Sequence, residues 1–336
     1  MNIFKIINIA GKVLAYKLFN KSIPVSATLS VTDRCNSRCA YCGFSVRNTK
    51  ELSLTEIKSV IDILCSLGVE RLGLWGGEPL VREDIGDIVD YCKTKKLYTT
   101  MVTNGYLIKD KFNVIKKMDD VIISFDGLRE CHDKNREAGA YDKVLQSMRT
   151  LYDNKIKFFT ITVLTKNNIN RKNIDYILEL SKKYNFFTTF QILHHNEHLG
   201  AECGNLLPSH EEYVEVLKYI DSKRKENRNV ASSGMYFKHL IRWENLHKVC
   251  KPAKNKKENC LAGKIYLNID TDGYVYPCSV QIGQMQGVKC DSKNLLKELQ
   301  KNKINCDDCV CGCYVEYNKL FDFNFSTVYQ WFKNLI

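Results

Sequence analysis

The sequence contains no apolar run of the roughly 18–20 residues that a transmembrane helix needs. Its first segment, residues 1–20, is apolar overall, but Lys5, Lys12 and Lys17 interrupt it and no small-residue cleavage site follows. A secretory signal peptide keeps its lysines ahead of an unbroken apolar core and ends in small residues. Because both features are absent, we expect a cytoplasmic protein.

Proline is scarce, with 5 residues in 336, and the chain has neither internal repeats nor a low-complexity tract. Hydrophobic residues make up 44% of the composition, which argues against a disordered chain. Acidic residues are outnumbered, 38 against 50 Lys and Arg, and the formal net charge is +12. The electrostatic field of this net positive charge favours anionic partners, namely a phosphorylated metabolite, an acidic peptide, a nucleic acid or a lipid headgroup. Equally, the charge could contribute only to solubility, with no specific anionic partner.

Cysteine, in contrast, is abundant, with 15 residues in the chain. A secreted protein would use them in disulfides, but cytosolic thiols stay reduced. The cysteines are clustered, with three in residues 35–42 and four in residues 306–313. Clusters of this kind in a reducing compartment indicate ligands to a metal or an iron–sulfur centre.

Between residues 26 and 226, short β-rich runs alternate with amphipathic helical stretches. The expected strands are Ser26–Thr32, Glu70–Trp75, Leu97–Thr103, Asp120–Phe125, Lys157–Leu164 and Phe186–Ile192. The expected helices cover residues 53–67, 82–94, 108–118, 141–154, 170–184 and 210–226. Strand and helix alternating in this way predict parallel strands with helices outside. Because six units are too few for a standard eight-stranded barrel, we predict an α/β fold with a partial (β/α)6 barrel.

The basic segment Lys251–Asn259 contains a proline and reads as a linker into a second region. We therefore expect an N-terminal amphipathic helix in residues 1–25, the partial barrel in 26–250 and a small cysteine-rich extension in 251–336. The extension shows strand patterns at Lys264–Asp270 and Tyr274–Pro277. It is too small for much of a core of its own, and small cysteine-rich units often compensate with metal sites.

Cys35, Cys39 and Cys42 follow the first expected strand at a C-x3-C-x2-C spacing. Three thiolates can hold a cubane cluster and leave one of its four irons without a protein ligand, whereas electron-transfer clusters normally take four cysteines. An open iron suits a cluster that binds another molecule. The alternative is a zinc site that a distant fourth ligand completes.

Polar or flexible residues stand at the ends of the later expected strands. These are Gly76-Gly77-Glu78-Pro79, Thr103-Asn104-Gly105, Ser124-Phe125-Asp126-Gly127 and the pair His194-His195. In parallel barrels, catalytic residues gather at the carboxyl ends of the strands. Two glycines permit close backbone approach, so backbone carbonyls and Glu78 can meet the amino group of a ligand, although a plain tight turn would have the same sequence. The histidine pair either faces the substrate or is incidental.

These motifs resemble those of the radical S-adenosylmethionine (SAM) superfamily, whose signature is this cysteine spacing with an aromatic residue, here Tyr41, before the last cysteine. The resemblance covers residues 26 to 318 and implies that Cys35, Cys39 and Cys42 bind a [4Fe–4S] cluster whose fourth iron SAM chelates. It also implies a SAM-binding site formed by Tyr41, Gly76, Gly77, Glu78, Pro79, Asn104, Ser124 and Arg136. A turn cap and a surface charge are the alternative roles of Ser124 and Arg136.

Cys260, Gly273 and Cys278 resemble the opening of the SPASM/twitch extension, which carries auxiliary iron–sulfur clusters. The later run from Cys306 to Cys313 begins with the expected C-x2-C and then departs from the full pattern. We expect one auxiliary [4Fe–4S] cluster held by Cys260, Cys278, Cys306 and Cys309, with Cys313 or Cys311 able to replace one of them. A zinc site of the same thiolates is the alternative.

The resemblance implies an enzyme of oxidoreductase or transferase type that reductively cleaves SAM to a 5′-deoxyadenosyl radical and abstracts hydrogen from a substrate. A flavodoxin- or ferredoxin-type protein is the expected reductant. Peptide or protein substrates are our first choice, and an anionic small molecule, sugar or lipid is the second. From another class, a zinc-stabilised nucleic-acid-binding protein would use the +12 charge, but no nucleic-acid module is recognisable and we expect no specific nucleic-acid partner.

The N-terminal segment carries one further hypothesis. The apolar residues on one helical face are Ile3, Ile6, Ile7, Ala10, Val13, Leu14 and Leu18, with Lys5 and Lys12 off that face. Such a helix either packs against the barrel, which we favour, or rests on an anionic membrane surface through residues 1–20.

Overall fold

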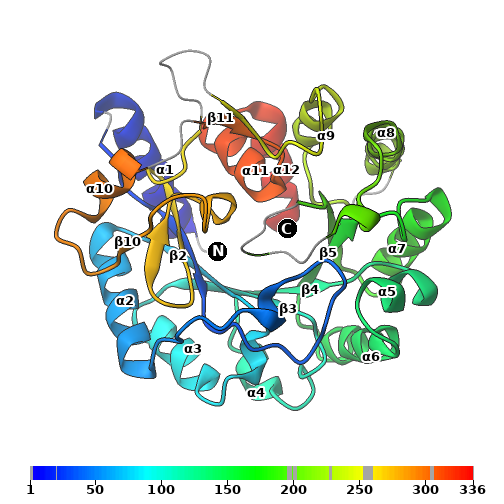
Figure 1. The fold of residues 1–336 in the computed structure, drawn as a ribbon, viewed down its shortest axis with the longest axis horizontal. Coiled ribbons are helices and arrows are strands. Elements are labelled where there is room, and N and C mark those ends of the chain that lie inside the picture. The colour runs from blue at the N-terminus through cyan, green and yellow to red at the C-terminus, as the bar shows by residue number, and fades with distance from the viewer. Residues whose placement is uncertain are drawn as a thin grey trace.

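The structure is a computed structural model that describes residues 3–19, 21–194, 199, 203–226, 229–252, 260–302 and 306–335. A nine-stranded sheet forms its centre, in the order β10-β9-β8-β1-β2-β3-β4-β5-β6. Helices cover the outer side of this curved sheet (Figure 1). The predicted α/β class with a partial barrel is confirmed.

Six parallel strands build the barrel, and each pairs with the next one along the chain. They are β1 (Ser26–Ser30), β2 (Arg71–Trp75), β3 (Tyr98–Thr103), β4 (Asp120–Ser124), β5 (Phe158–Leu164) and β6 (Phe187–Ile192). The helices between and after them are α2 (Leu54–Leu67), α3 (Ile85–Thr94), α4 (Phe112–Ile115), α5 (Arg129–Asn135), α6 (Ala140–Asp153), α7 (Arg171–Lys183), α8 (His210–Glu226) and α9 (Gly234–Ile241). Every predicted strand is present, within two residues at either end.

The helix predicted at residues 108–118 is much shorter than expected, since only α4 is α-helical there and turns flank it. Ile108 and Ile115 are its fully buried apolar residues. Two buried positions are too few to define a continuous apolar face, and helices in proteins depend on such a face for their stability. By contrast, α2 begins at a capping box between Ser53 and Glu56 and ends at Gly68, whose φ is +103°.

The alternation of buried and half-exposed residues along the strands shows which side of the sheet retains solvent access. In β5 the residues from Phe158 to Leu164 alternate strictly, with every second one buried. The buried Phe158 and Leu164 share the apolar core with Ile174 and Ile177 of α7, so this set faces the helices that cover the sheet. The half-exposed set lies on the opposite, inner face, because successive side chains of a strand point to opposite faces. Ser124 at the end of β4 and Gln191 in β6 belong to the half-exposed set. The inner side therefore remains accessible to a ligand.

The C-terminal extension continues the barrel sheet. Strand β8 (Tyr266–Ile269) lies parallel beside β1, from Ser26↔Tyr266 to Leu29↔Ile269. Strand β9 (Tyr274–Tyr276) follows a turn after β8 and pairs antiparallel with it, and β10 (Val288–Lys289) pairs with β9. The cysteine-rich region and the barrel thus share one hydrogen-bonded sheet.

Further strands and helices lie outside the nine-stranded sheet. They are the two-stranded sheet of β7 (Cys250–Pro252) and β11 (Cys306–Cys309), and the helices α10 (Leu295–Asn302), α11 (Gly312–Phe321) and α12 (Phe325–Leu335). The backbone N–H of Gly312 at the start of α11 donates to Gln191 of β6 at 3.0 Å. Helix α11 therefore joins β6, the last barrel strand, to the extension.

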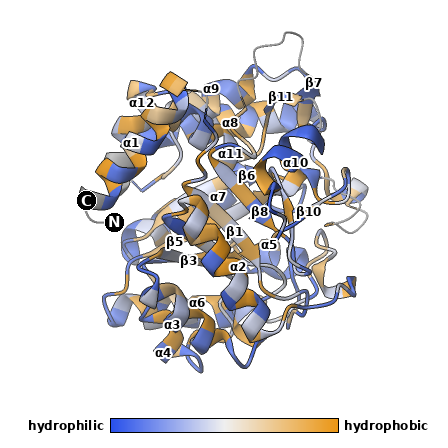
Figure 2. Cartoon of the chain, turned by 90° about the vertical axis from the view of Figure 1, so that its left-hand side faces the viewer, coloured by the Kyte–Doolittle hydropathy of each residue, from blue (hydrophilic) through white to orange (hydrophobic). Residues whose placement is uncertain are grey.

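Helix α1 (Ile3–Phe19) packs against the amino-terminal ends of the barrel strands, as we favoured. Lys12 donates to the carbonyl of Gly68 at 2.8 Å and pairs with Glu70 at 2.7 Å. Its neighbour Val13 is 1% exposed, whereas Leu14 is 49% exposed. In Figure 2, α1 and α12 lie next to each other. Within the described residues, no helix has both the length and the apolarity that crossing a bilayer requires.

Candidate active site

The three-cysteine loop leaves the carboxyl end of β1, and all three thiols are free and half-buried. Side chains from two other segments donate to its sulfur atoms: Asn104 Nδ2 lies 4.0 Å from Cys35 Sγ, and Arg136 Nη1 lies 3.7 Å from Cys39 Sγ. Ser37 Oγ lies 3.5 Å from Cys39 Sγ as well. Donors and a cation next to sulfur favour the thiolate, which is the form that binds iron. The donor set therefore fits an iron–sulfur cluster.

Burial acts in the opposite direction on the same loop. It raises the pKa of Cys35 to about 12 and also raises that of Cys42. A metal that binds these sulfurs must therefore displace their protons, so binding couples to pH.

Arg136 is the centre of a buried polar network beside the loop. Its Nε donates to Asp126 at 2.9 Å and its Nη2 donates to the Tyr41 hydroxyl at 2.8 Å. Tyr41 in turn donates to Asp126 at 3.2 Å. Because Arg136 is 8% and Asp126 0% exposed, Arg136 is not a surface charge. The network fixes the cysteine loop to the carboxyl end of β4.

Asp126 is a site residue that our prediction did not include. It is fully buried and, besides Arg136 and Tyr41, it accepts from the backbone of Val163 at 3.2 Å. His132 Nδ1 accepts from the Asp126 backbone N–H at 3.0 Å. The only sequence signal was an acidic residue directly after a strand end, in Ser124-Phe125-Asp126-Gly127.

Gly76 and Gly77 allow the end of β2 to touch the segment that leads into the cysteine loop. A Cβ on Gly76 would lie 2.4 Å from the Thr32 carbonyl oxygen, and one on Gly77 would lie 2.3 Å from that of Arg34. Gly76 also has a φ of +130°. The Gly77 N–H donates to Thr32 at 2.7 Å. The glycines are therefore required for the position of the loop itself.

Glu78 is buried, 1% exposed, with both carboxylate oxygens hydrogen-bonded. It accepts from Thr103 Oγ1 at 2.8 Å, from the Asn104 N–H at 2.7 Å and from the Leu80 N–H at 3.1 Å. Burial raises the pKa of Glu78 to about 7 against the effect of these bonds. In the structure Glu78 thus fixes the end of β3 and the position of Asn104. Pro79 is buried and begins a short 3-10 turn.

Two further predicted residues lie at the strand ends. Ser124 is half-buried, and within the described chain its side chain makes no hydrogen bond, so its hydroxyl is available to a ligand. Both ring nitrogens of His194 are buried without a partner among the described residues, and burial lowers the pKa of His194 to about 4. His195 lies outside the described residues.

The four cysteines predicted to hold an auxiliary cluster are all buried. Cys260 is 5% exposed, and Cys278, Cys306 and Cys309 are 6% exposed. Burial raises the pKa of Cys278 to about 12, with contributions from the neighbouring Cys260 and Cys306. Burial likewise raises the pKa of Cys309, and Cys311, Cys260 and Cys278 add to the rise. The fold therefore brings these thiols, separated by up to 49 positions (309 − 260), into one neighbourhood.

Cys311 and Cys313 differ in their surroundings. Burial raises the pKa of Cys311, and the neighbouring Cys313 and Cys278 contribute to the rise. The charged neighbours of Cys313 are Arg71 and Glu316. Cys311 and Cys313 are the two predicted replacements for a cluster ligand. Of these, Cys311 is the one that has a predicted cluster ligand, Cys278, among its neighbours. Among the described residues, no three His, Cys, Asp or Glu side chains are arranged to hold a single metal ion.

The model of the radical SAM superfamily matches residues 29–181, from β1 into α7. This chain carries a radical SAM domain. The domain contains the three-cysteine loop, the glycine pair and the Arg136 network. The family's cofactors, a [4Fe–4S] cluster and SAM, agree with our prediction, and the family's members are enzymes.

Named relatives extend this result. A GTP 3′,8-cyclase of Clostridium perfringens (strain SM101 / Type A) is 34% identical over 165 residues, 46% of this chain and 51% of that protein. The mycofactocin maturase MftC of Mycolicibacterium smegmatis is 27% identical over 271 residues, 77% of this chain and 65% of that protein. This chain thus spans about half the length of the cyclase it matches.

Among solved structures, Streptococcus suis SuiB bound to S-adenosylmethionine superposes with a TM-score of 0.67 at 16% identity. The match covers 85% of this chain and 68% of SuiB. At this identity the likeness establishes the shared fold.

Proposed function

We propose that the protein is a radical SAM enzyme that acts on a peptide or protein, with Cys35, Cys39 and Cys42 as the ligands of its [4Fe–4S] cluster. The observation that carries the proposal is the network in which Arg136 contacts Cys39 at 3.7 Å and joins Tyr41 to Asp126. When bound, the cluster and SAM supply a 5′-deoxyadenosyl radical, which is able to take hydrogen from an unactivated C–H bond.

The chain's own residues position and shield this chemistry. Asn104 and Arg136 direct donors at the cysteine sulfurs, and Gly76 and Gly77 bring the end of β2 against the start of the loop. The backbone of the glycine pair is the proposed partner of the SAM amino group, while Glu78 holds the neighbouring strand end in place. The Ser124 hydroxyl on the accessible inner side is the proposed contact for SAM or substrate.

One auxiliary cluster held by Cys260, Cys278, Cys306 and Cys309 completes the proposal. Four thiolates saturate such a cluster and suit it to electron transfer. The support is their common burial and the mutual effects on their pKa values. If one of these four cysteines is not a ligand, Cys311 is the proposed replacement.

Two observations favour a peptide or protein substrate. The relative with the longest of the matches above, over 77% of this chain, is named a maturase. SuiB, which shares the fold, has also been solved bound to its precursor peptide SuiA. A short precursor-peptide gene beside the gene of this protein would support this choice.

A second candidate is an anionic small-molecule substrate. Relatives named GTP 3′,8-cyclase are 34% and 36% identical over about half of the chain, and the formal net charge of +12 suits an anionic substrate. Consumption of a nucleotide in the presence of SAM and reductant, with no peptide added, would favour this candidate over the first.

Anaerobic reconstitution with iron and sulfide, followed by dithionite and SAM, tests the two cluster sites. We expect about eight irons per chain and slow release of 5′-deoxyadenosine without substrate. Cys39→Ala should abolish the release, because one cluster ligand is lost. Cys278→Ala should lose about half of the iron and keep part of the release.

The matched control is Cys65→Ala, since Cys65 is half-buried within α2 and lies outside both groups of cysteines. It should change neither iron content nor release. Identical behaviour of Cys39→Ala and Cys278→Ala would contradict the division into two sites.

A further inference from the structure

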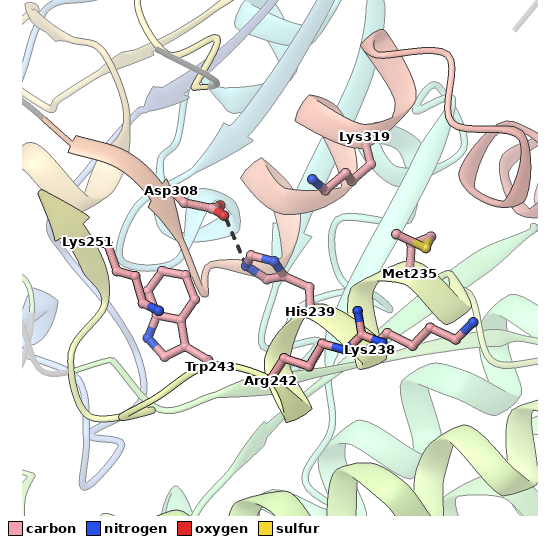
Figure 3. A pocket seen from close by; sticks show the side chains of 8 residues that line it. All are labelled: Met235, Lys238, His239, Arg242, Trp243, Lys251, Asp308 and Lys319. Carbon is pink, nitrogen blue, oxygen red and sulfur yellow. Dashed lines mark ion pairs between the residues drawn. The ribbon is translucent and has the colours of Figure 1, made fainter. Parts of the chain in front are cut away.

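A cavity of about 460 Å³ lies between α9, β7, β11 and α11 (Figure 3). Its lining is strongly basic, with Lys238 from α9, Arg242 directly after α9, Lys251 from β7 and Lys319 from α11. The one carboxylate in the lining is Asp308 of β11. Cationic side chains from three separate elements thus face a single space.

The carboxylates near the cavity are already engaged. Asp308 Oδ1 accepts a hydrogen bond from the Cys309 N–H at 2.9 Å and lies 3.6 Å from His239 Nε2. Lys251 pairs with Glu244 at 3.3 Å. Within the part of the chain that the structure describes, Lys238, Arg242 and Lys319 make no ion pair. Three cations of the lining therefore lack an ion-pair partner among the described residues.

Unpaired charges of one sign around a concave space repel one another, and the space focuses their field. An anion that enters relieves the repulsion and gains charge-assisted hydrogen bonds. The planar guanidinium of Arg242 can bind two oxygens of one phosphate, and the lysine ammonium groups can act as point charges for further oxygens. The volume lies in the range of small-molecule sites, about 300–1,000 Å³.

The walls of the cavity are fixed by the fold. Trp243 is 4% exposed, and its Nε1 donates to the carbonyl of Lys248 at 2.9 Å. The Lys251 ammonium lies over the Trp243 ring, 4.4 Å from its centroid. His239 Nε2 lies 2.8 Å from the carbonyl oxygen of Cys309. Lys251 therefore lies over a buried aromatic ring, and His239 joins α9 to the strand that carries two of the proposed auxiliary ligands.

We propose that this cavity is a binding site for a small molecule that carries two or more phosphate groups. Three unpaired cations match the charge of a diphosphate, and Arg242 provides the planar recognition of one phosphate. The site is separate from the SAM-binding strand ends, and the proposal does not depend on the reaction that occurs there.

Isothermal titration of the reconstituted full chain with inorganic pyrophosphate at about 0.15 M salt tests the proposal, because this ionic strength screens non-specific surface attraction. We expect saturable binding of one pyrophosphate per chain. Arg242→Gln and Lys238→Gln should each weaken it about tenfold or more, which corresponds to about 1.4 kcal/mol. Both side chains are exposed, so the variants should fold normally.

The control is Lys218→Gln, which removes the same charge from an exposed position on α8 and should change the affinity less than about twofold. Cys39→Ala should bind pyrophosphate as the parent chain does, because the cavity does not involve the cysteine loop. Absence of saturable binding, equal effects of Arg242→Gln and Lys218→Gln, or loss of binding in Cys39→Ala would overturn the proposal. Equal affinity for citrate would overturn the assignment to phosphate.

Discussion

At the scale of single residues, the most informative group is the buried pair of Arg136 and Asp126. The two side chains are 6% and 0% exposed and 2.9 Å apart. The prediction from sequence found Arg136 through family resemblance but missed Asp126, because an acidic residue after a strand is common in turns. Burial and the contact to Cys39, 97 positions away, depend on the tertiary fold.

Replacement of Arg136 by methionine should lower the free energy of unfolding by about 3–5 kcal/mol, because the Asp126 carboxylate would stay buried without its partner. Adding Asp126→Asn should restore part of that loss. Denaturant unfolding without oxygen measures both effects. As a control, Arg171→Met breaks a pair whose side chains are 65% and 70% exposed, and it should cost less than about 1 kcal/mol. Equal losses in Arg136→Met and Arg171→Met would disprove the role of burial.

His132 provides a pH-dependent effect at the same scale. Burial, followed by the charge of Arg136, lowers the pKa of His132 from 6.5 to about 2. Below pH 6.5 the unfolded chain therefore binds a proton at His132 that the folded chain does not bind. The free energy of unfolding thus decreases as the pH falls. At pH 5.5 this single group should reduce the free energy of unfolding by about 1.4 kcal/mol.

The variant His132→Asn keeps an acceptor for the Asp126 N–H and removes the titration. Its free energy of unfolding should fall less than that of the parent chain between pH 7.5 and pH 5.5, by about 1.4 kcal/mol. Urea unfolding at both pH values measures the difference. Parallel pH profiles of the two proteins would show that His132 is protonated in the fold.

At the scale of elements, the six barrel strands could be predicted from sequence to within two residues. Each is a short β-branched or aromatic run between turn residues, and such local patterns are sufficient for strands buried in a parallel sheet. The position of β8 could not be predicted in this way. Its partner β1 lies 240 positions earlier (266 − 26), and pairing over that distance leaves no local signal. The same holds for β7 and β11.

The end of β2 is the element whose backbone has the strictest requirement. Gly76→Ala should lower the free energy of unfolding by about 3 kcal/mol or more, because φ is +130° and the new Cβ would meet the Thr32 oxygen at 2.4 Å. Iron content after reconstitution should fall too, since the same segment leads into the cysteine loop. Thermal unfolding and iron analysis provide the measurements.

Gly86→Ala is the matched control for this experiment. Gly86 lies inside α3, and the nearest atom to its added Cβ is 3.7 Å away. Alanine should stabilise the helix by up to about 1 kcal/mol. A loss of stability in Gly86→Ala as large as that in Gly76→Ala would reject our account.

At the scale of the whole molecule, α1 covers the amino-terminal ends of the strands and also presents an apolar outer surface. Val13 faces inward, while Leu14, Leu18 and Phe19 are 49%, 67% and 76% exposed. Sequence periodicity places Val13, Leu14 and Leu18 on one apolar face of the helix. A wide apolar stripe does not show which of its edges is buried against the protein, so the different exposures of these residues could not be predicted. Helix α12 adds Phe325, which is 83% exposed.

The same substitution at two adjacent positions of α1 distinguishes the buried side of the helix from its exposed side. Val13→Asn should lower the free energy of unfolding by about 2 kcal/mol or more, because it places an amide in the buried contact with the barrel. Leu14→Asn should change it by less than about 0.5 kcal/mol. Chemical unfolding measures both. A larger loss for Leu14→Asn would mean that the outer side is covered in solution.

The outer surface also allows a direct test of the proposed membrane contact. If it binds lipid, Leu18→Asn combined with Phe19→Asn should reduce co-sedimentation with anionic vesicles without changing the unfolding curve. Vesicle binding that does not change on these substitutions, or on deletion of residues 1–20, would exclude α1 as the lipid-binding element.

The pairing of β1 with both β2 and β8 has a consequence for biosynthesis. On the ribosome, β1 and the cysteine loop emerge 240 residues (266 − 26) before β8 does. At typical synthesis rates of about 5–20 residues per second, the edge of β1 that pairs with β8 stays unpaired for roughly 12–48 s. An open strand edge of that duration invites pairing with other nascent chains. If the cysteine loop receives iron as we propose, delivery after release of the chain, when β8 has closed the strand edge beside the loop, would avoid this competing pairing.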